Sequence, residues 1–413
     1  MTFRRLASGG ALALVYAATT ACGTPGTDPG TTTETTAATT AAMAPAFEYD
    51  PTWPKTLPNN WLMGEVGAMT SDAKGHIWVL QRPSSTVNLS ERFGLQGAGE
   101  CCFPAPPVME FDPEGNLIQA WGPIHGSTPR DETGPTGPQP LLGPQVWGPF
   151  PDIEWPDHEH GISVDYKDNV WVNDQRAPSA LLKFSRDGQF LARMGGEEST
   201  SSNDTKNFAG PAGVLVDPDT NELFVADGYR NRRVIVFDAE TGVYKRHWGA
   251  YGKQPPDGPQ GGGPVEGRYD PDVVSQQFAT VHCITMSRDR LLYVCDRGNN
   301  RIQVFQPDGT FVRETIVTRT GGLGAVHAIG LSSDAEQEFL YVGDGTNKKV
   351  WILRRDDLSI VGSFGHGGRG GGQFLIVHTL AVDFEGNIYV GETRNNNRVQ
   401  KFKFVGMRPA DAN

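Results

Sequence analysis

One pattern of segments recurs six times in this chain of 413 residues, and it limits the folds that the sequence can adopt. Each copy has an alternating apolar segment, a turn rich in Gly, Asp or Asn, and a second apolar segment. The residue before the turn is, in chain order, Asp72, Asp165, Asp217, Ser287, Ser332 and Asp383. Alternation with a period of two and turns of this composition are typical of antiparallel hairpins. The repeat therefore predicts an all-β chain.

Third and fourth apolar segments follow, as in residues 234–238 before Gly242 and residues 302–305 before Gly309. Six units of four short strands predict a six-bladed β-propeller, a ring that leaves only short, protected sheet edges. The last copy ends after its third strand. We therefore expect residues 47–60 to supply the missing strand and close the ring. An open β-solenoid is the alternative.

The N-terminus has a different composition. Arg4 and Arg5 precede a short run of apolar and small residues that ends at Cys22. This order is typical of a secretory signal peptide. A cysteine directly after a small residue predicts a lipoprotein-type signal peptide at residues 1–21, with a lipid on Cys22. Plain cleavage and an uncleaved anchor are the alternatives.

Residues 22–46 are mostly Thr, Ala, Gly and Pro, so they predict a flexible tether that has no core of its own. The predicted propeller spans residues 47–406, and residues 407–413 form a tail. We expect an exported protein that is anchored by its lipid to the bacterial cell envelope, on the periplasmic or cell-surface side.

The net charge argues about the class of partner, and the cysteines indicate which disulfides can form. The formal net charge is −12, which argues against a nucleic-acid partner. Cys283 and Cys295 lie on two predicted strands joined by a short turn, so they can form a cross-strand disulfide. Cys101 and Cys102 are adjacent and form either a vicinal disulfide or two thiols. Neither pair has the spacing of a zinc–thiolate site.

Histidines recur at one position of the repeat, at the start of the first strand. Four copies carry His160, His282, His327 and His378 there, and the other two carry Gly67 and Ala212. In a closed ring this position faces the central channel. The second, fourth and sixth copies have threefold spacing about the axis. Three neutral imidazoles suit Zn²⁺ with an open fourth position. Hydrogen bonds from the histidines to water or backbone are the alternative.

The end of the second strand supplies a further set of polar residues on the same face of the ring. These residues are Arg82, Tyr229 and Arg297. Arginine binds carboxylates through paired hydrogen bonds, and a phenol beside a metal or a guanidinium can act as a base. Ordinary surface-loop residues are the alternative. Three Gly/Pro-rich insertions should form a canopy over this face. They span residues 83–107, 123–157 and 250–279.

The blades resemble NHL repeats, as in Asp-Gly-Tyr at 227–229 and Asp-Arg-Gly-Asn-Asn-Arg at 296–301. Over residues 47–405 the chain is similar to the peptidyl-α-hydroxyglycine α-amidating lyases. That resemblance implies a zinc-dependent carbon–nitrogen lyase that cleaves a peptidyl-α-hydroxyglycine to a peptide amide and glyoxylate. It implies His160, His282 and His378 as zinc ligands, and Tyr229, Arg82 and Arg297 as catalytic residues.

The chain departs from this family at a second ion. The resemblance implies a structural Ca²⁺ held partly by an aspartate after the last zinc histidine, but Thr379 stands there. The other calcium contacts would be the backbone carbonyls of Met69 and Ile162. His327 is an additional histidine. Two other functions remain open: a non-catalytic propeller that binds a peptide, glycan or protein partner, and a calcium-dependent hydrolase.

Overall fold

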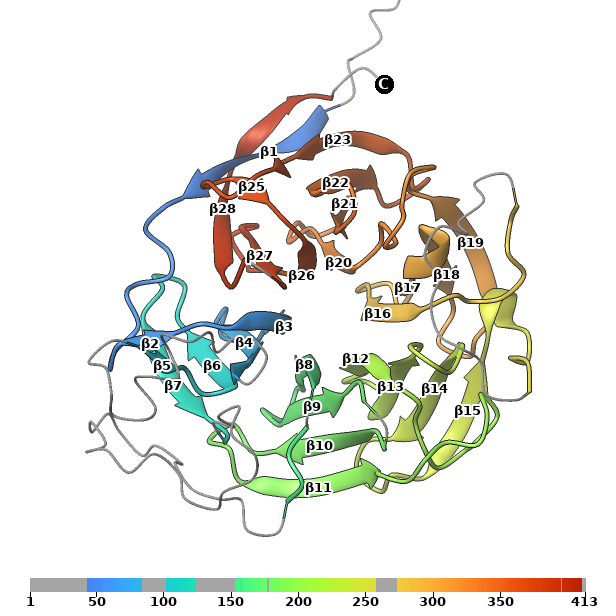
Figure 1. Cartoon of the computed structure of the whole chain (residues 1–413). Helices are drawn as coiled ribbons and strands as arrows, with labels where there is room; N and C mark the ends of the chain where they lie inside the picture. The colour runs from blue at the N-terminus through green and yellow to red at the C-terminus, as the bar shows by residue number, and fades with distance from the viewer. Residues whose placement is uncertain are drawn as a thin grey trace, which may run out of the picture. The chain divides into compact units, whose positions relative to one another are not determined.

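Six four-stranded antiparallel sheets surround a central axis in the computed structural model (Figure 1). The predicted all-β, six-bladed propeller is therefore confirmed. The structure describes residues 43–83, 102–123, 153–156, 158–176, 178–257, 273–394 and 396–410. The predicted signal peptide, Cys22 and most of the tether lie outside these residues, as do Cys101 and most of the predicted canopy. None of the helices in the described ranges is long and apolar enough to cross a membrane.

The first strand of each repeat lies innermost in its blade (Figure 1). The innermost strands are β3 (Glu65–Ser71), β8 (Glu159–Val164), β12 (Pro211–Val216), β16 (Val281–Met286), β20 (Ala328–Leu331) and β26 (Val377–Val382). The second strands are β4 (Ile77–Arg82), β9 (Val170–Asp174), β13 (Glu222–Asp227), β17 (Leu292–Asp296), β21 (Phe339–Asp344) and β27 (Ile388–Glu392). The channel face of the ring is therefore built from six equivalent strands.

Two outer strands complete each of the first five blades. In chain order they are β6 (Val108–Phe111), β7 (Leu117–Trp121), β10 (Ala180–Phe184), β11 (Phe190–Gly195), β14 (Arg233–Asp238), β15 (Tyr244–Trp248), β18 (Arg301–Phe305), β19 (Phe311–Ile316), β22 (Lys349–Arg354) and β23 (Ile360–Phe364). Short strand pairs and single turns of 3₁₀ helix lie in the loops within and between blades. They are β2 (Trp61–Leu62) with β5 (Phe103–Pro104), β24 (His366–Gly367) with β25 (Gln373–Phe374), η1 (Ala250–Gly252) and η2 (Arg297–Asn299).

The N-terminal strand closes the ring, as predicted. Strand β1 (Met43–Asp50) pairs with β28 (Val399–Pro409), so the sixth blade has the order β1-β28-β27-β26. This pair is longer than predicted at both ends: β1 begins within the segment assigned to the tether, and β28 runs into the predicted tail. The reason is packing, because Ala44 is fully buried in the apolar cluster of the last two blades.

Side chains from adjacent blades share each core. Ala68, Trp78 and Leu80 of the first blade pack against Ile162 and Val172 of the second. Burying a large apolar side chain stabilises the fold by roughly 1.5–3 kcal/mol. In three blades the acid before the first turn also accepts a hydrogen bond from an aromatic side chain of the second strand. The pairs are Asp72 with Trp78, Asp165 with Trp171, and Asp383 with Tyr389.

A disulfide links the two inner strands of the fourth blade. Cys283 of β16 and Cys295 of β17 are direct cross-strand partners and are bonded to each other. This pairing agrees with the cross-strand disulfide expected from the sequence. The bond lies one residue from His282 and two residues from Arg297, so it ties the strand that carries His282 to the strand that directly precedes Arg297.

Candidate active site

The predicted histidine position coincides with a break in strand register. In five blades the pairing of the first two strands shifts there, and the extra residue is Gly67, His160, Ala212, His282 or His378. A β-bulge of this kind bends a strand and re-aims a side chain. The sequence repeat therefore creates equivalent inward-facing positions, and three of the five carry an imidazole.

Those three imidazoles form a compact triad. The side chains of His160, His282 and His378 are buried, and their candidate ligand nitrogens lie within 4.8 Å of one another. Burial holds the pKa of each imidazole well below its usual value, and neighbouring arginines and histidines add to the effect. The triad is therefore neutral at physiological pH, the state in which histidine binds a metal.

Hydrogen bonds to neighbouring blades orient two of these rings. Nδ1 of His160 lies 3.1 Å from the carbonyl oxygen of Ala212, and Nδ1 of His282 lies 2.7 Å from that of His327. A carbonyl oxygen only accepts hydrogen bonds, so the proton of each neutral ring is on Nδ1. Nε2 of each ring therefore presents a lone pair, as a metal ligand requires.

The hydroxyl of Tyr229 lies between these two lone pairs. It is 2.7 Å from Nε2 of His160 and 3.0 Å from Nε2 of His282. A single hydroxyl proton can satisfy only one of the two acceptors. The second buried lone pair therefore lacks a proton donor in this arrangement, and a cation would satisfy it. The triad could bind a metal on these grounds.

Close packing and a buried ion pair position the loop that carries Tyr229. A Cβ atom at Gly228 would lie 2.1 Å from the backbone nitrogen of Val281, so only glycine allows the loop to approach β16 this closely. Asp227 pairs with Arg233 at 2.8 Å, and both side chains are fully buried. Asp227 also accepts a hydrogen bond from the backbone of Ala209.

Arg297 lies beside the same hydroxyl. Its Nη1 donates a hydrogen bond of 3.1 Å to Tyr229, and its guanidinium lies 5.1 Å from the centre of the Tyr229 ring. No carboxylate pairs with Arg297 in the part of the chain that the structure describes. The preceding residue, Asp296, is buried against Arg301 at 2.6 Å, which fixes the start of the loop. Arg297 can therefore pair with an anionic ligand.

Arg82 has a different environment. It is buried, and its guanidinium contacts Glu65 at 3.1 Å, the Thr393 hydroxyl at 3.2 Å and the Glu159 carbonyl oxygen at 2.7 Å. The structure thus brings Tyr229 and Arg297 into contact with each other but holds Arg82 in an ion pair. Glu65 was missed from the sequence, although Glu65 and Arg82 are direct cross-strand partners.

Thr379 is engaged with the neighbouring blade. Its hydroxyl oxygen accepts a hydrogen bond of 3.0 Å from the backbone N–H of Met69. The threonine that stands in place of the expected acid thus links β26 to β3. Binding of Ca²⁺ at this place stays a prediction.

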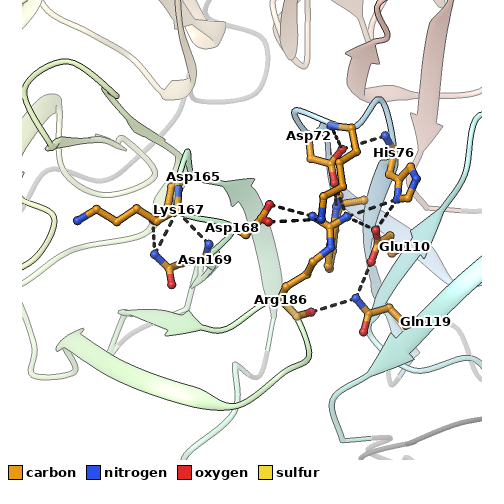
Figure 2. Close-up of polar contacts among 11 residues, drawn as sticks. Asp72, His76, Glu110, Gln119, Asp165, Lys167, Asp168, Asn169 and Arg186 are labelled. Atoms are coloured by element: carbon orange, nitrogen blue, oxygen red, sulfur yellow. Dashed lines mark hydrogen bonds and ion pairs between the residues drawn. The ribbon is translucent and has the colours of Figure 1, made fainter.

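A second group of potential ligands consists of Asp72, His76 and Glu110 in the first blade. Figure 2 shows the guanidinium of Arg186, from the second blade, directed at this group. Arg186 contacts Asp72 at 2.6 Å and also pairs with Glu110. Because a guanidinium from the second blade already bridges both carboxylates, this group is an ion-pair network that joins two blades.

Part of the fourth blade matches a known repeat family. The NHL repeat family matches residues 278–305, which contain β16, β17 and β18. The solved streptogramin B lyase structure aligns with 87% of this chain and 97% of its own chain, at 13% identity and a TM-score of 0.48. The six-bladed β-propeller formed by this chain contains an NHL repeat at residues 278–305.

Relatives that are similar in sequence indicate a more specific class of protein than the fold alone. The chain is 30% identical over 241 residues to peptidyl-glycine alpha-amidating monooxygenase B of Xenopus laevis, covering 57% of this chain and 25% of that protein. It is 28% identical over 259 residues to peptidyl-alpha-hydroxyglycine alpha-amidating lyase 1 of Drosophila melanogaster, covering 59% of this chain and 44% of that protein. The protein is therefore homologous, at modest identity, to amidating lyases, and the match spans less than half the length of these two relatives.

Proposed function

We propose that this protein is a zinc-dependent carbon–nitrogen lyase that cleaves a peptidyl-α-hydroxyglycine, or a small-molecule relative, to an amide and glyoxylate. The observation that carries the proposal is the convergence of three buried imidazoles within 4.8 Å beside the Tyr229 hydroxyl. Homology to proteins named for this reaction supports it.

The triad supplies the ligands that zinc prefers. His160, His282 and His378 would hold the ion, because three neutral imidazoles leave the fourth tetrahedral position open for substrate. When bound, zinc would polarise the substrate hydroxyl and make it more acidic. The remaining steps belong to the side chains around the triad.

Tyr229 and Arg297 would move the proton and balance the charge. The oxygen of Tyr229, once its own proton has passed to solvent, would accept the proton of the substrate hydroxyl. The carbon–oxygen bond becomes a carbonyl as the carbon–nitrogen bond breaks, and Tyr229 returns the proton to the departing amide nitrogen. Arg297, 3.1 Å from that oxygen, stabilises its negative charge and pairs with the substrate carboxylate. Arg82 adds positive charge near the triad from its fixed position.

Release of glyoxylate tests the reaction directly. Purified protein loaded with one equivalent of zinc should convert α-hydroxyhippurate to benzamide and glyoxylate, and removal of zinc with a chelator should abolish the conversion. If zinc-loaded, folded protein forms no glyoxylate, the lyase proposal is wrong. A non-catalytic propeller that binds a peptide, glycan or protein would then be favoured.

We also propose that the protein is exported and anchored to the bacterial cell envelope through a lipid on Cys22, with residues 22–46 as the tether. The order of charged, apolar and small residues before Cys22 supports this. In a bacterial host, Cys22→Ala should move the protein from the membrane fraction to the soluble exported fraction. Retention of the variant in the membrane fraction would contradict the lipid anchor.

A further inference from the structure

A fourth histidine, His327, lies beside the triad but further from its centre. Its ring centre is 5.4 Å from that of His282 and 6.1 Å from that of His378, whereas the triad rings are 4.9–5.1 Å apart. Strand β20 begins at the next residue, and the backbone N–H of His327 donates to the carbonyl oxygen of Gly343. The fifth blade therefore presents its histidine differently from the second, fourth and sixth.

Its hydrogen bonding is also the reverse of that of His160 and His282. The backbone N–H of Gly345 donates to Nδ1 of His327 over 3.3 Å. A ring nitrogen that accepts a hydrogen bond carries no proton, so the proton of the neutral ring is on Nε2. His160 and His282 carry theirs on Nδ1, as their carbonyl partners require.

The backbone at Gly345 lies close enough to the His327 ring to make this hydrogen bond. A Cβ atom at residue 345 would lie 2.6 Å from Cε1 of His327, so any side chain there would displace the imidazole. The absence of a side chain at Gly345 lets the peptide N–H approach the ring edge. The orientation of His327 is thus set by main-chain geometry.

The Nε2–H group of His327 has no acceptor among the residues that the structure describes. His327 is buried, and it lines the central cavity of about 350 Å³ together with His160, His282 and His378. Nε2 of His327 is not one of the fully buried polar atoms that lack a partner, so it is accessible from the cavity. An oxygen atom of a ligand bound there can accept a hydrogen bond from it.

We propose that His327 is not a metal ligand but a substrate-binding residue, whose Nε2–H group holds an oxygen atom of the substrate beside the metal triad. A protonated nitrogen has no lone pair for a metal, so the two roles exclude each other. A carboxylate or hydroxyl oxygen of an α-hydroxy acid fits this donor. The inference rests on the metal site and substrate class of the proposed function, but it does not require that the lyase reaction occurs.

The test separates metal binding from ligand binding. His327→Leu removes the donor and keeps an apolar side chain, and His327→Gln restores an N–H group near the position of Nε2. Both variants should bind one zinc ion per chain, like the wild type, and His160→Ala should not. Calorimetry with glycolate on zinc-loaded protein should give about tenfold weaker binding for His327→Leu and a change within about threefold for His327→Gln.

A spectroscopic measurement on the wild type tests the tautomer independently of any variant. Nitrogen-15 NMR of histidine-labelled protein should place the proton of His327 on Nε2 and those of His160 and His282 on Nδ1. Loss of zinc in a folded His327→Leu or His327→Gln variant would overturn the inference, as would unchanged glycolate affinity in His327→Leu or a proton on Nδ1 of His327. A wild type that binds no zinc would instead overturn the proposed function.

Discussion

The phenolic oxygen of Tyr229, in the loop after the second strand of blade three, lies 2.7 Å from Nε2 of His160 on the inner strand of blade two. A hydrogen bond thus joins the loop of blade three to the inner strand of blade two at the triad. The same oxygen contacts His282 of blade four at 3.0 Å. The predicted base therefore lies directly beside two of the predicted metal ligands.

Removal of the triad should remove the metal. We expect the His160→Ala/His282→Ala/His378→Ala variant to purify with no zinc, because the three converging imidazoles are then lost, and the wild type to carry about one zinc ion per chain. Elemental analysis of purified protein measures this. His366→Ala, at an exposed histidine of β24, is the matched control and should keep its zinc. A folded triple variant with full zinc content would mean that the metal binds elsewhere.

Loss of the Tyr229 hydroxyl should remove catalysis but not the metal. Tyr229→Phe keeps the ring that lies under Arg297 and deletes the proposed base, so we expect kcat to fall by about 10²- to 10⁴-fold with zinc content unchanged. Glyoxylate release is the measurement. Tyr244→Phe, which deletes a hydroxyl bonded to His247 on an outer strand, is the control. Undiminished turnover in Tyr229→Phe would show that another group takes the proton.

The two arginines should separate into a structural and a ligand-binding residue. Arg82→Ala leaves Glu65 without its partner in a mostly buried position, so we expect the free energy of unfolding to fall by about 3 kcal/mol. Arg297→Ala breaks no carboxylate pair within the described residues. It should change stability by less than about 1 kcal/mol but raise KM about tenfold. Urea unfolding measures the stability of both variants, and steady-state kinetics measures their KM. A large stability loss in Arg297→Ala with an unchanged KM would contradict this prediction.

The disulfide of the fourth blade should support both stability and the metal. Replacing Cys283 and Cys295 together by serine opens a short loop closed by residues 12 apart in sequence, and we expect a loss of about 3 kcal/mol in the free energy of unfolding. Zinc affinity should also fall, since His282 is next to Cys283. Denaturant titrations and competition with a zinc chelator measure the two effects. Equal zinc affinity in variant and wild type would contradict the second effect.

Acid should weaken the closure of the ring. Burial alone would raise the pKa of Asp50 in β1, but hydrogen bonds from Thr52 and the ammonium of Lys403 outweigh it and lower that pKa to about 2. The resulting stability is present above the unfolded value of 3.8 and is lost as the pH falls toward 2. Lys403 is about half exposed, so screening limits the effect to about 1 kcal/mol.

Two variants on strand β1 test this effect of acid on stability. Asp50→Asn should destabilise the protein at pH 7, and its difference from wild type should shrink between pH 4 and pH 2. Glu48→Gln, exposed on the same strand, should show no such trend. Chemical unfolding followed across this pH range measures both. A difference for Asp50→Asn that is constant with pH would contradict the assignment.

The repeat made much of this architecture predictable. A period of two, turns at fixed places and an incomplete last copy together predict six blades and closure by the N-terminal segment. The position of the histidines within the repeat predicts that His160, His282 and His378 converge. These features follow from local pattern and ring symmetry, so one sequence is enough to predict them.

Features that depend on which atoms meet across blades were not predictable in this way. The ion pair of Arg82 with Glu65, the hydrogen bond of Thr379 to Met69 and the tautomer of His327 each arise from a particular backbone approach. Likewise, Ala44 reads as part of a low-complexity segment in the sequence, yet it packs in the core because β28 offers a partner strand.

The carbonyl groups that orient His160 and His282 belong to the next histidine-position residue along the ring, in blades three and five. No single blade can form the triad, so its geometry exists only when the ring is closed. By thermodynamic linkage, an ion that binds the triad must stabilise the closed ring over any opened form. At a free ion concentration a thousand times the Kd, that linkage is worth about 4 kcal/mol. The concentration of free metal would then set the stability of the whole propeller.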